Sequence, residues 1–184
     1  MGINLHLGCG KRRLPGYINI DIINYPSVDR IMDVTNLDAF DDNSVSIIYA
    51  SHILEHFFLH EVDQILSEWY RVLRSEGVLR LSVPDFEKLV FVYNKYKDIR
   101  LIMGPLYGKG VIIGANETPH RFVYDEATLR KLLREAGFNN ITRWDWRKVF
   151  VGELKDFDDY SQAYIPHMDK KNGELISLNI EAYK

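Results

Sequence analysis

The sequence has little of several features that would assign it to a particular class of protein. It contains one cysteine, Cys9, so no disulfide can form within the chain. No apolar run approaches the roughly 18 residues of a membrane span, and no signal peptide precedes the first predicted strand. The net charge of −3 argues against a binder of duplex nucleic acid, which usually has a strong basic bias. We therefore expect a cytoplasmic protein that binds no DNA and has no membrane span.

What is present is an ordinary globular composition, 46% hydrophobic and 27% charged over 184 residues. This length favours one domain, and we expect it to cover residues 1–184. Apolar runs predict strands over residues 3–7, 17–22, 30–34, 45–50, 78–83, 141–150 and 175–183. Helical spacing predicts helices over residues 61–74, 85–96 and 125–135. The alternation of strands and helices predicts an α/β three-layer sandwich with a mostly parallel seven-stranded sheet.

Glycines and acids occur where several predicted strands end. In an open parallel sheet, ligands bind beyond the carboxyl ends of the strands, near the topological switch point. The residues at these ends are Gly8, Cys9, Gly10, Asp21, Asp33, Ser51, His52 and Asp85. They are the first candidates for a binding site.

The spacing of these residues excludes a dinucleotide site. A dinucleotide turn needs a third glycine, and Arg13 occupies that position. Asp21 follows Gly10 by 11 residues, whereas about 20 are expected for a dinucleotide fold. An adenosine without phosphates fits better, because the two oxygens of Asp21 can accept bonds from both ribose hydroxyls. S-adenosylmethionine is a ligand of this kind.

Several segments together resemble a class I S-adenosylmethionine-dependent methyltransferase with a Rossmann-like fold. They read LGCG, NIDI, DVTNLDAFDDNSVSIIYASHILEH, VLRSEGVLRLSVPD and HRFVYDEATLRKLLREAGF. The set is most similar to a small family with an LGCG…PG…NID opening, whose members are often linked to sugar and cell-surface glycan biosynthesis. The resemblance implies that S-adenosylmethionine is the cofactor and S-adenosylhomocysteine the product.

The resemblance also implies roles for individual positions. Gly8 and Gly10, with Cys9 between them as a small apolar filler, would pack near the methionine part of the cofactor. Asp21 would bind the ribose, and Asp33 with the backbone of Val34 would contact the adenine. Ala50 and Ser51 would lie near the sulfonium. The chain departs from the broader class because residues 11–16 leave almost no room for the first crossover helix.

The sequence HILEH permits a different interpretation. His52, Glu55 and His56 fit an inverted zinc-protease signature, and His60 continues the spacing, so the histidines could line one helix face. The same letters belong to the methyltransferase-like segment, where no metal is implied. We favour an orienting role for Glu55 and His56 and expect no metal, with a zinc hydrolase as an alternative.

A glycine-bearing stretch, residues 98–120, is expected to be a lid or substrate loop that ends at His120. We expect methyl transfer to a hydroxyl of a small molecule such as a sugar, with His52 and His120 as candidate catalytic residues. The alternatives are a non-catalytic binding module with this fold and an RNA or protein methyltransferase. Residues 153–160 are interpreted as a solvated excursion or as a substrate or homodimer surface.

Overall fold

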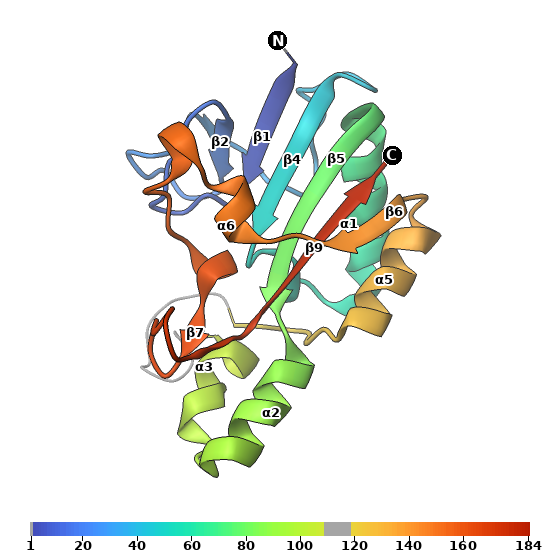
Figure 1. Cartoon of the computed structure of the whole chain (residues 1–184). Helices are drawn as coiled ribbons and strands as arrows, with labels where there is room; N and C mark the ends of the chain where they lie inside the picture. The colour runs from blue at the N-terminus through green and yellow to red at the C-terminus, as the bar shows by residue number, and fades with distance from the viewer. Residues whose placement is uncertain (1, 109–118) are drawn as a thin grey trace.

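The computed structural model describes residues 2–108 and 119–184, and a seven-stranded sheet runs through it (Figure 1). The strand order is β3-β2-β1-β4-β5-β9-β6, and only β9 runs antiparallel to its neighbours. The strands are β1 (Ile3–Leu7), β2 (Ile18–Asp21), β3 (Arg30–Ile31), β4 (Val45–Ser51), β5 (Leu73–Pro84), β6 (Asn139–Arg143) and β9 (Ser177–Tyr183). The predicted mostly parallel sheet is confirmed.

Helices and single turns connect these strands. The helices are α1 (Leu59–Val72), α2 (Phe86–Tyr96), α3 (Arg100–Tyr107), α5 (Glu126–Glu135) and α6 (Trp146–Val149). The 3-10 turns are η1 (Leu54–His56), η2 (Gly152–Leu154) and η3 (Tyr160–Gln162), and a second small sheet pairs β7 (Tyr164–Ile165) with β8 (Glu174–Leu175). Within residues 2–108 and 119–184, no helix has the length and apolar character needed to cross a membrane.

The main core lies between one face of the sheet and helices α1 and α5. Apolar residues of α1 recur every three or four positions, so they form one buried stripe. Trp69 is completely buried in this stripe, and its indole N–H donates to the Val34 carbonyl at 2.9 Å. Truncating such a side chain to alanine typically costs about 3–5 kcal/mol. Trp69 therefore fixes α1 to the loop that follows β3.

The connection between β1 and β2 contains only turns, in a stretch that the structure describes completely. The fully buried side chain of Asn19 takes the place of helical hydrogen bonding there. Its oxygen accepts from the Leu14 amide at 2.8 Å and from His6 Nδ1 at 2.9 Å, and its amide group donates to the Tyr17 carbonyl at 3.0 Å. The near absence of the first crossover helix is confirmed.

The face of the sheet that this helix would cover is packed instead against residues 144–162, the covering segment (Figure 1). Tyr49 of β4 packs on Trp144 and Phe150, and its hydroxyl donates to Asp159 Oδ2 at 2.6 Å. Asp159 is buried, whereas the other residues of the stretch 153–160 are exposed or half-buried. The interpretation of this stretch as a solvated excursion is therefore wrong for Asp159 only.

Other expectations also differ from the structure, among them the strand predicted over residues 30–34, which ends at Ile31. The strand predicted over residues 141–150 ends at Arg143 because Asp145 caps α6, accepting from the Arg147 amide at 2.9 Å. In the stretch 98–120, residues Arg100–Tyr107 form helix α3 and not an irregular loop. Gly110 and Gly114 of that stretch lie outside the described residues. In Figure 1, α2 and α3 lie beyond the carboxyl ends of β4 and β5.

Candidate functional site

The glycine turn after β1 has a backbone that other residues adopt poorly. Gly8 and Gly10 have φ values of 65° and 54°, in the left-handed region. A Cβ on Gly8 would lie 2.7 Å from the end of the Ile53 side chain, whereas a Cβ on Gly10 would meet no atom within 4 Å. Gly8 is thus required by packing, while Gly10 leaves open space beside the turn.

The carboxylate of Asp21 holds this turn against the end of β2. Its Oδ2 accepts from the Gly10 amide at 2.8 Å, and its Oδ1 accepts from the Ile23 amide at 2.9 Å. Each carboxylate oxygen has two lone-pair sites, so both retain capacity for one further donor. Asp21 is partly exposed, so a ligand with two neighbouring hydroxyls can reach it.

The second acid of the predicted site, Asp33, lies in the chain that follows β3. The Met32 amide donates to the Asp21 carbonyl at 3.1 Å, which places the loop with Asp33 beside β2. Asp33 is exposed, and its Oδ1 accepts from the amide and hydroxyl of Thr35 at 2.9 and 2.8 Å. Val34 is buried, and its carbonyl is the acceptor for Trp69.

The other predicted cofactor residues differ in their availability. Cys9 is buried, and this burial raises the pKa of its thiol to about 12, so it is no thiolate nucleophile at neutral pH. Ala50 is completely buried and packs in the main core. Ser51 is partly exposed, and its buried hydroxyl has no hydrogen-bond partner among the described residues. An unpaired buried hydroxyl at a strand end is a polar group available to a ligand.

His52 follows β4 directly and is held at both ring nitrogens. Its Nδ1 lies 3.0 Å from Glu55 Oε1, and its Nε2 lies 3.1 Å from Ser177 Oγ. The Ser177 hydroxyl donates its only proton to the Tyr160 carbonyl at 2.5 Å, so Nε2 of His52 is the donor to Ser177. The ring therefore leaves no nitrogen free for a substrate in this arrangement.

His120 also lies beside Glu55, and only one of its ring nitrogens is within hydrogen-bond distance of a partner. Its Nδ1 lies 2.8 Å from the Pro105 carbonyl of α3, and its Nε2 lies 4.0 Å from Glu55 Oε1. Burial lowers the pKa of His120 more than the nearby Glu55 carboxylate raises it. The neutral imidazole with a free Nε2 is thereby favoured.

Glu55 is the centre of a histidine cluster that sequence reasoning did not find. Its side chain is completely buried on η1, with His52, His56 and His120 around it. Burial alone would raise the pKa of Glu55, but the ring of His52 beside the carboxylate lowers it by more, so the carboxylate is ionised at neutral pH. His60 is exposed at the start of α1 and stacks on Phe58, so the predicted row of histidines on one helix face is wrong.

One aromatic ring connects the glycine turn to this cluster. Tyr160 of η3 lies with its ring centre 4.7 Å from the guanidinium carbon of Arg12 and 5.4 Å from the ring centre of His52. Arg12 belongs to the turn that contains Gly10, and His52 belongs to the Glu55 cluster. The glycine turn and the Glu55 cluster are therefore separated by a single side chain, that of Tyr160.

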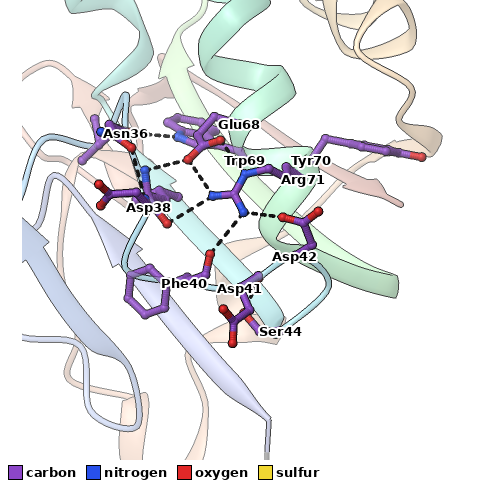
Figure 2. A network of polar contacts seen from close by, with 12 residues as sticks. Asn36, Asp38, Phe40, Asp41, Asp42, Ser44, Glu68, Trp69, Tyr70 and Arg71 are labelled. Carbon is purple, nitrogen blue, oxygen red and sulfur yellow. Dashed lines mark hydrogen bonds and ion pairs between the residues drawn. The ribbon is translucent and has the colours of Figure 1, made fainter.

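A further polar cluster lies at the amino end of β4 and has a different character (Figure 2). The guanidinium of Arg71 donates to Glu68 at 2.8 Å, to Asp42 at 2.5 Å and to the Phe40 carbonyl at 3.2 Å. Its donors are thus taken up by the end of α1 and the loop before β4. We assign this cluster to the attachment of that loop.

Comparison with known proteins supports the fold. Residues 15–81, roughly a third of the chain, match the family described as Methyltransferase domain, a match that omits the glycine turn. No curated protein matches the chain. A SAM-dependent methyltransferase from Methanosarcina mazei is similar at 17% identity with a TM-score of 0.59, over 98% of this chain and 91% of that one. The chain has the class I methyltransferase fold.

Two further solved structures share this fold. A SAM-dependent methyltransferase from Archaeoglobus fulgidus is 15% identical with a TM-score of 0.57, over 100% of this chain and 86% of that one. The N1-methyltransferase for 1,6-didemethyltoxoflavin from Burkholderia thailandensis is 15% identical with a TM-score of 0.58, over 99% of this chain and 70% of that one. The latter was solved with S-adenosylhomocysteine and its acceptor bound.

Proposed function

We propose that this chain is an S-adenosylmethionine-dependent methyltransferase that acts on a hydroxyl of a small molecule, with a sugar or glycan precursor as the favoured acceptor. One observation carries the proposal: Tyr160 contacts both Arg12, on the cofactor side, and His52, on the acceptor side. Methyl transfer requires donor and acceptor to be held next to each other, and such positioning can supply as much as about 7–11 kcal/mol.

The cofactor side is formed by the ends of the first strands. The open space beside Gly10 leaves room for a small aliphatic chain, and the spare lone pairs of Asp21 suit the two ribose hydroxyls. We assign the adenine to Asp33 and the backbone of Val34, and the region of the sulfonium to Ser51, whose hydroxyl is unpaired. When bound, the cofactor supplies an electrophilic methyl group. A structure of this fold with S-adenosylhomocysteine bound supports the choice of cofactor.

On the acceptor side, the contacts favour His120 over His52. His120 keeps Nε2 free while Pro105 holds Nδ1, so this nitrogen is the one available to accept a hydrogen bond from an acceptor hydroxyl. His52 has both nitrogens engaged and acts as a positioning residue for Glu55. We assign the wall on this side to the described part of the stretch 98–120, which is α3 with Pro119 and His120.

Calorimetric titration with S-adenosylhomocysteine tests the cofactor site. We expect the wild-type chain to bind and Asp21→Ala to weaken binding by at least about tenfold, since each lost bond to a charged group is worth about 1.5–3 kcal/mol. Asp38→Ala is the matched control, because Asp38 is an exposed acid in the distant cluster of Figure 2. Circular dichroism confirms that each variant is folded.

The acceptor is tested by transfer of an isotopically labelled methyl group to nucleotide sugars. We expect a labelled sugar product with the wild-type chain and at least a tenfold slower reaction with His120→Ala. If the chain binds the cofactor but labels no hydroxyl compound, the proposed acceptor class is refuted. The proposed cofactor site is not affected by that result.

A non-catalytic binding module is the second candidate function. It is favoured by the turn-only connection between β1 and β2, where a helix commonly forms one wall of the cofactor pocket. A folded wild-type chain that binds neither S-adenosylmethionine nor S-adenosylhomocysteine would establish this alternative.

A further inference from the structure

We propose that Glu55, His56 and His120 form a binding site for a divalent transition-metal ion, with Zn²⁺ as the best match. One ligand atom from each of the three side chains lies within 4.8 Å of the other two. Glu55 and His56 are neighbours on η1, and His120 comes from the chain after α3. The Glu55 carbonyl accepts from the amides of Arg121 and Phe122 at 2.8 and 3.2 Å, which holds the His120 segment against η1.

The hydrogen bonds of the two imidazoles orient them as metal ligands. Nδ1 of His120 lies 2.8 Å from the Pro105 carbonyl, and Nδ1 of His56 lies 3.2 Å from the Pro119 carbonyl. A carbonyl only accepts, so the proton of each neutral ring is on Nδ1 and the lone pair is on Nε2. Metal-binding histidines commonly donate their other ring N–H to a backbone carbonyl in this way.

The Glu55 carboxylate is buried at the centre of this site. The Glu55 side chain is 0% exposed, and its Oε1 lies 3.0 Å from His52 Nδ1, but its Oε2 has no hydrogen-bond partner among the described residues. Leaving a buried carboxylate oxygen without a partner is costly. Its Oε1 faces Nε2 of His120 at 4.0 Å, so two lone pairs oppose each other unless a proton or a metal ion lies between them.

The ligand set selects the kind of ion. Two imidazoles and one carboxylate with an open fourth position form a known type of zinc site. Ligands at a tetrahedral Zn²⁺ are about 3.4 Å apart, so the present arrangement needs to close by no more than about 1.5 Å. Ca²⁺ and Mg²⁺ are disfavoured because they prefer ligand sets of oxygen only.

This site differs from the zinc signature in the sequence. His52 has its Nε2 engaged with Ser177, and His60 is exposed and stacked on Phe58, so neither is a ligand. The third ligand, His120, comes from a distant part of the chain. The inference does not require methyl transfer. In one molecule, however, an ion and an acceptor hydroxyl exclude each other at Nε2 of His120.

Metal binding is tested on tag-free full-length chain treated with a chelator and then titrated with Zn²⁺ by calorimetry. Co²⁺, whose visible absorption reports nitrogen and oxygen coordination, serves as a second probe. We expect one Zn²⁺ per chain and a rise in melting temperature on addition of the ion. His56→Ala and His120→Ala are expected to weaken binding by at least about 100-fold, because each removes one of three ligands.

His60→Ala is the matched control and is expected to bind as the wild type does. Glu55→Gln tests the carboxylate, and because this residue is buried, the half-buried His56 provides a second variant that keeps the fold. Absence of Zn²⁺ binding up to about 1 mM would overturn the inference, as would unchanged binding in both histidine variants. In that case, protonated imidazoles neutralise Glu55. Titration with S-adenosylhomocysteine is independent of this result, so the two proposals can fail separately.

Discussion

Replacing Tyr49 by phenylalanine tests how the covering segment is held on the sheet. The Tyr49 side chain is 1% exposed, and burial together with the Asp159 carboxylate raises the pKa of its hydroxyl, so it remains a donor. It donates to Asp159 Oδ2 at 2.6 Å. The substitution removes this one hydrogen bond to a charged acceptor and leaves the ring in place. We expect the free energy of unfolding to fall by about 1.5–3 kcal/mol.

The surroundings of Asp159 support the upper part of this range. Its other oxygen, Oδ1, accepts from the Ser161 amide at 2.9 Å and the Ser161 hydroxyl at 2.6 Å. Without Tyr49, Oδ2 is left in a buried site without its donor, and an unpaired buried charge is costly. Because the two residues are in contact, the double variant Tyr49→Phe with Asp159→Asn is expected to cost less than the sum of the single changes.

Urea unfolding followed by tryptophan fluorescence gives the free energies. Tyr17→Phe is the matched control, since Tyr17 packs on the same cluster and its hydroxyl makes no hydrogen bond to the described residues. That change is expected to stay within about 0.5 kcal/mol of the wild type. A Tyr49→Phe variant as stable as the control would refute the reasoning, because the covering segment would then be held by apolar packing alone.

Three other predictions follow from the same contacts. Gly8→Ala is expected to destabilise the chain more than Gly10→Ala, by about 1–3 kcal/mol of overpacking, in denaturant unfolding. Cys9, with its pKa raised to about 12 by burial, is expected to resist alkylation at pH 8 in the folded chain and to react at once in urea. The amides of Asn19 lower the pKa of Asp29 to about 2, so its stabilisation is present above about pH 4 and is lost as the pH falls toward 2. Acid unfolding of Asp29→Asn is expected to lack that component.

The sequence predicted those parts of the fold that have local causes. The strand over residues 3–7 is confirmed at both ends, and the helices predicted to begin at Asp85 and Asp125 are confirmed, with these acids as the capping residues of α2 and α5. Apolar alternation, helical spacing and a capping side chain are all visible within a few residues of chain. For the same reason, the positions of Gly10 and Asp21 at neighbouring strand ends could be inferred before the structure.

Contacts between distant residues could not be inferred in this way. Tyr49 and Asp159 are 110 positions apart, and a run of acids around Asp159 is typical of a solvated loop until its partner is known. Likewise, HILEH gave His52 and His56 but not His120, which the backbone bonds to Glu55 bring to them. The expected helix face failed because η1 interrupts the chain between His52 and His60.

The covering segment packs on the sheet face that the missing crossover helix leaves uncovered. A sheet face that carries His6 and Tyr49 must be covered, and without a helix after β1 the cover comes from the connection between β6 and β9. That connection also carries Tyr160 to Arg12 and His52. The same segment covers the core and contacts both parts of the proposed site. Loss of the Tyr49–Asp159 hydrogen bond is therefore expected to lower both the stability of the fold and the affinity for the cofactor. Cofactor affinity measured on Tyr49→Phe is therefore expected to fall although Tyr49 is completely buried.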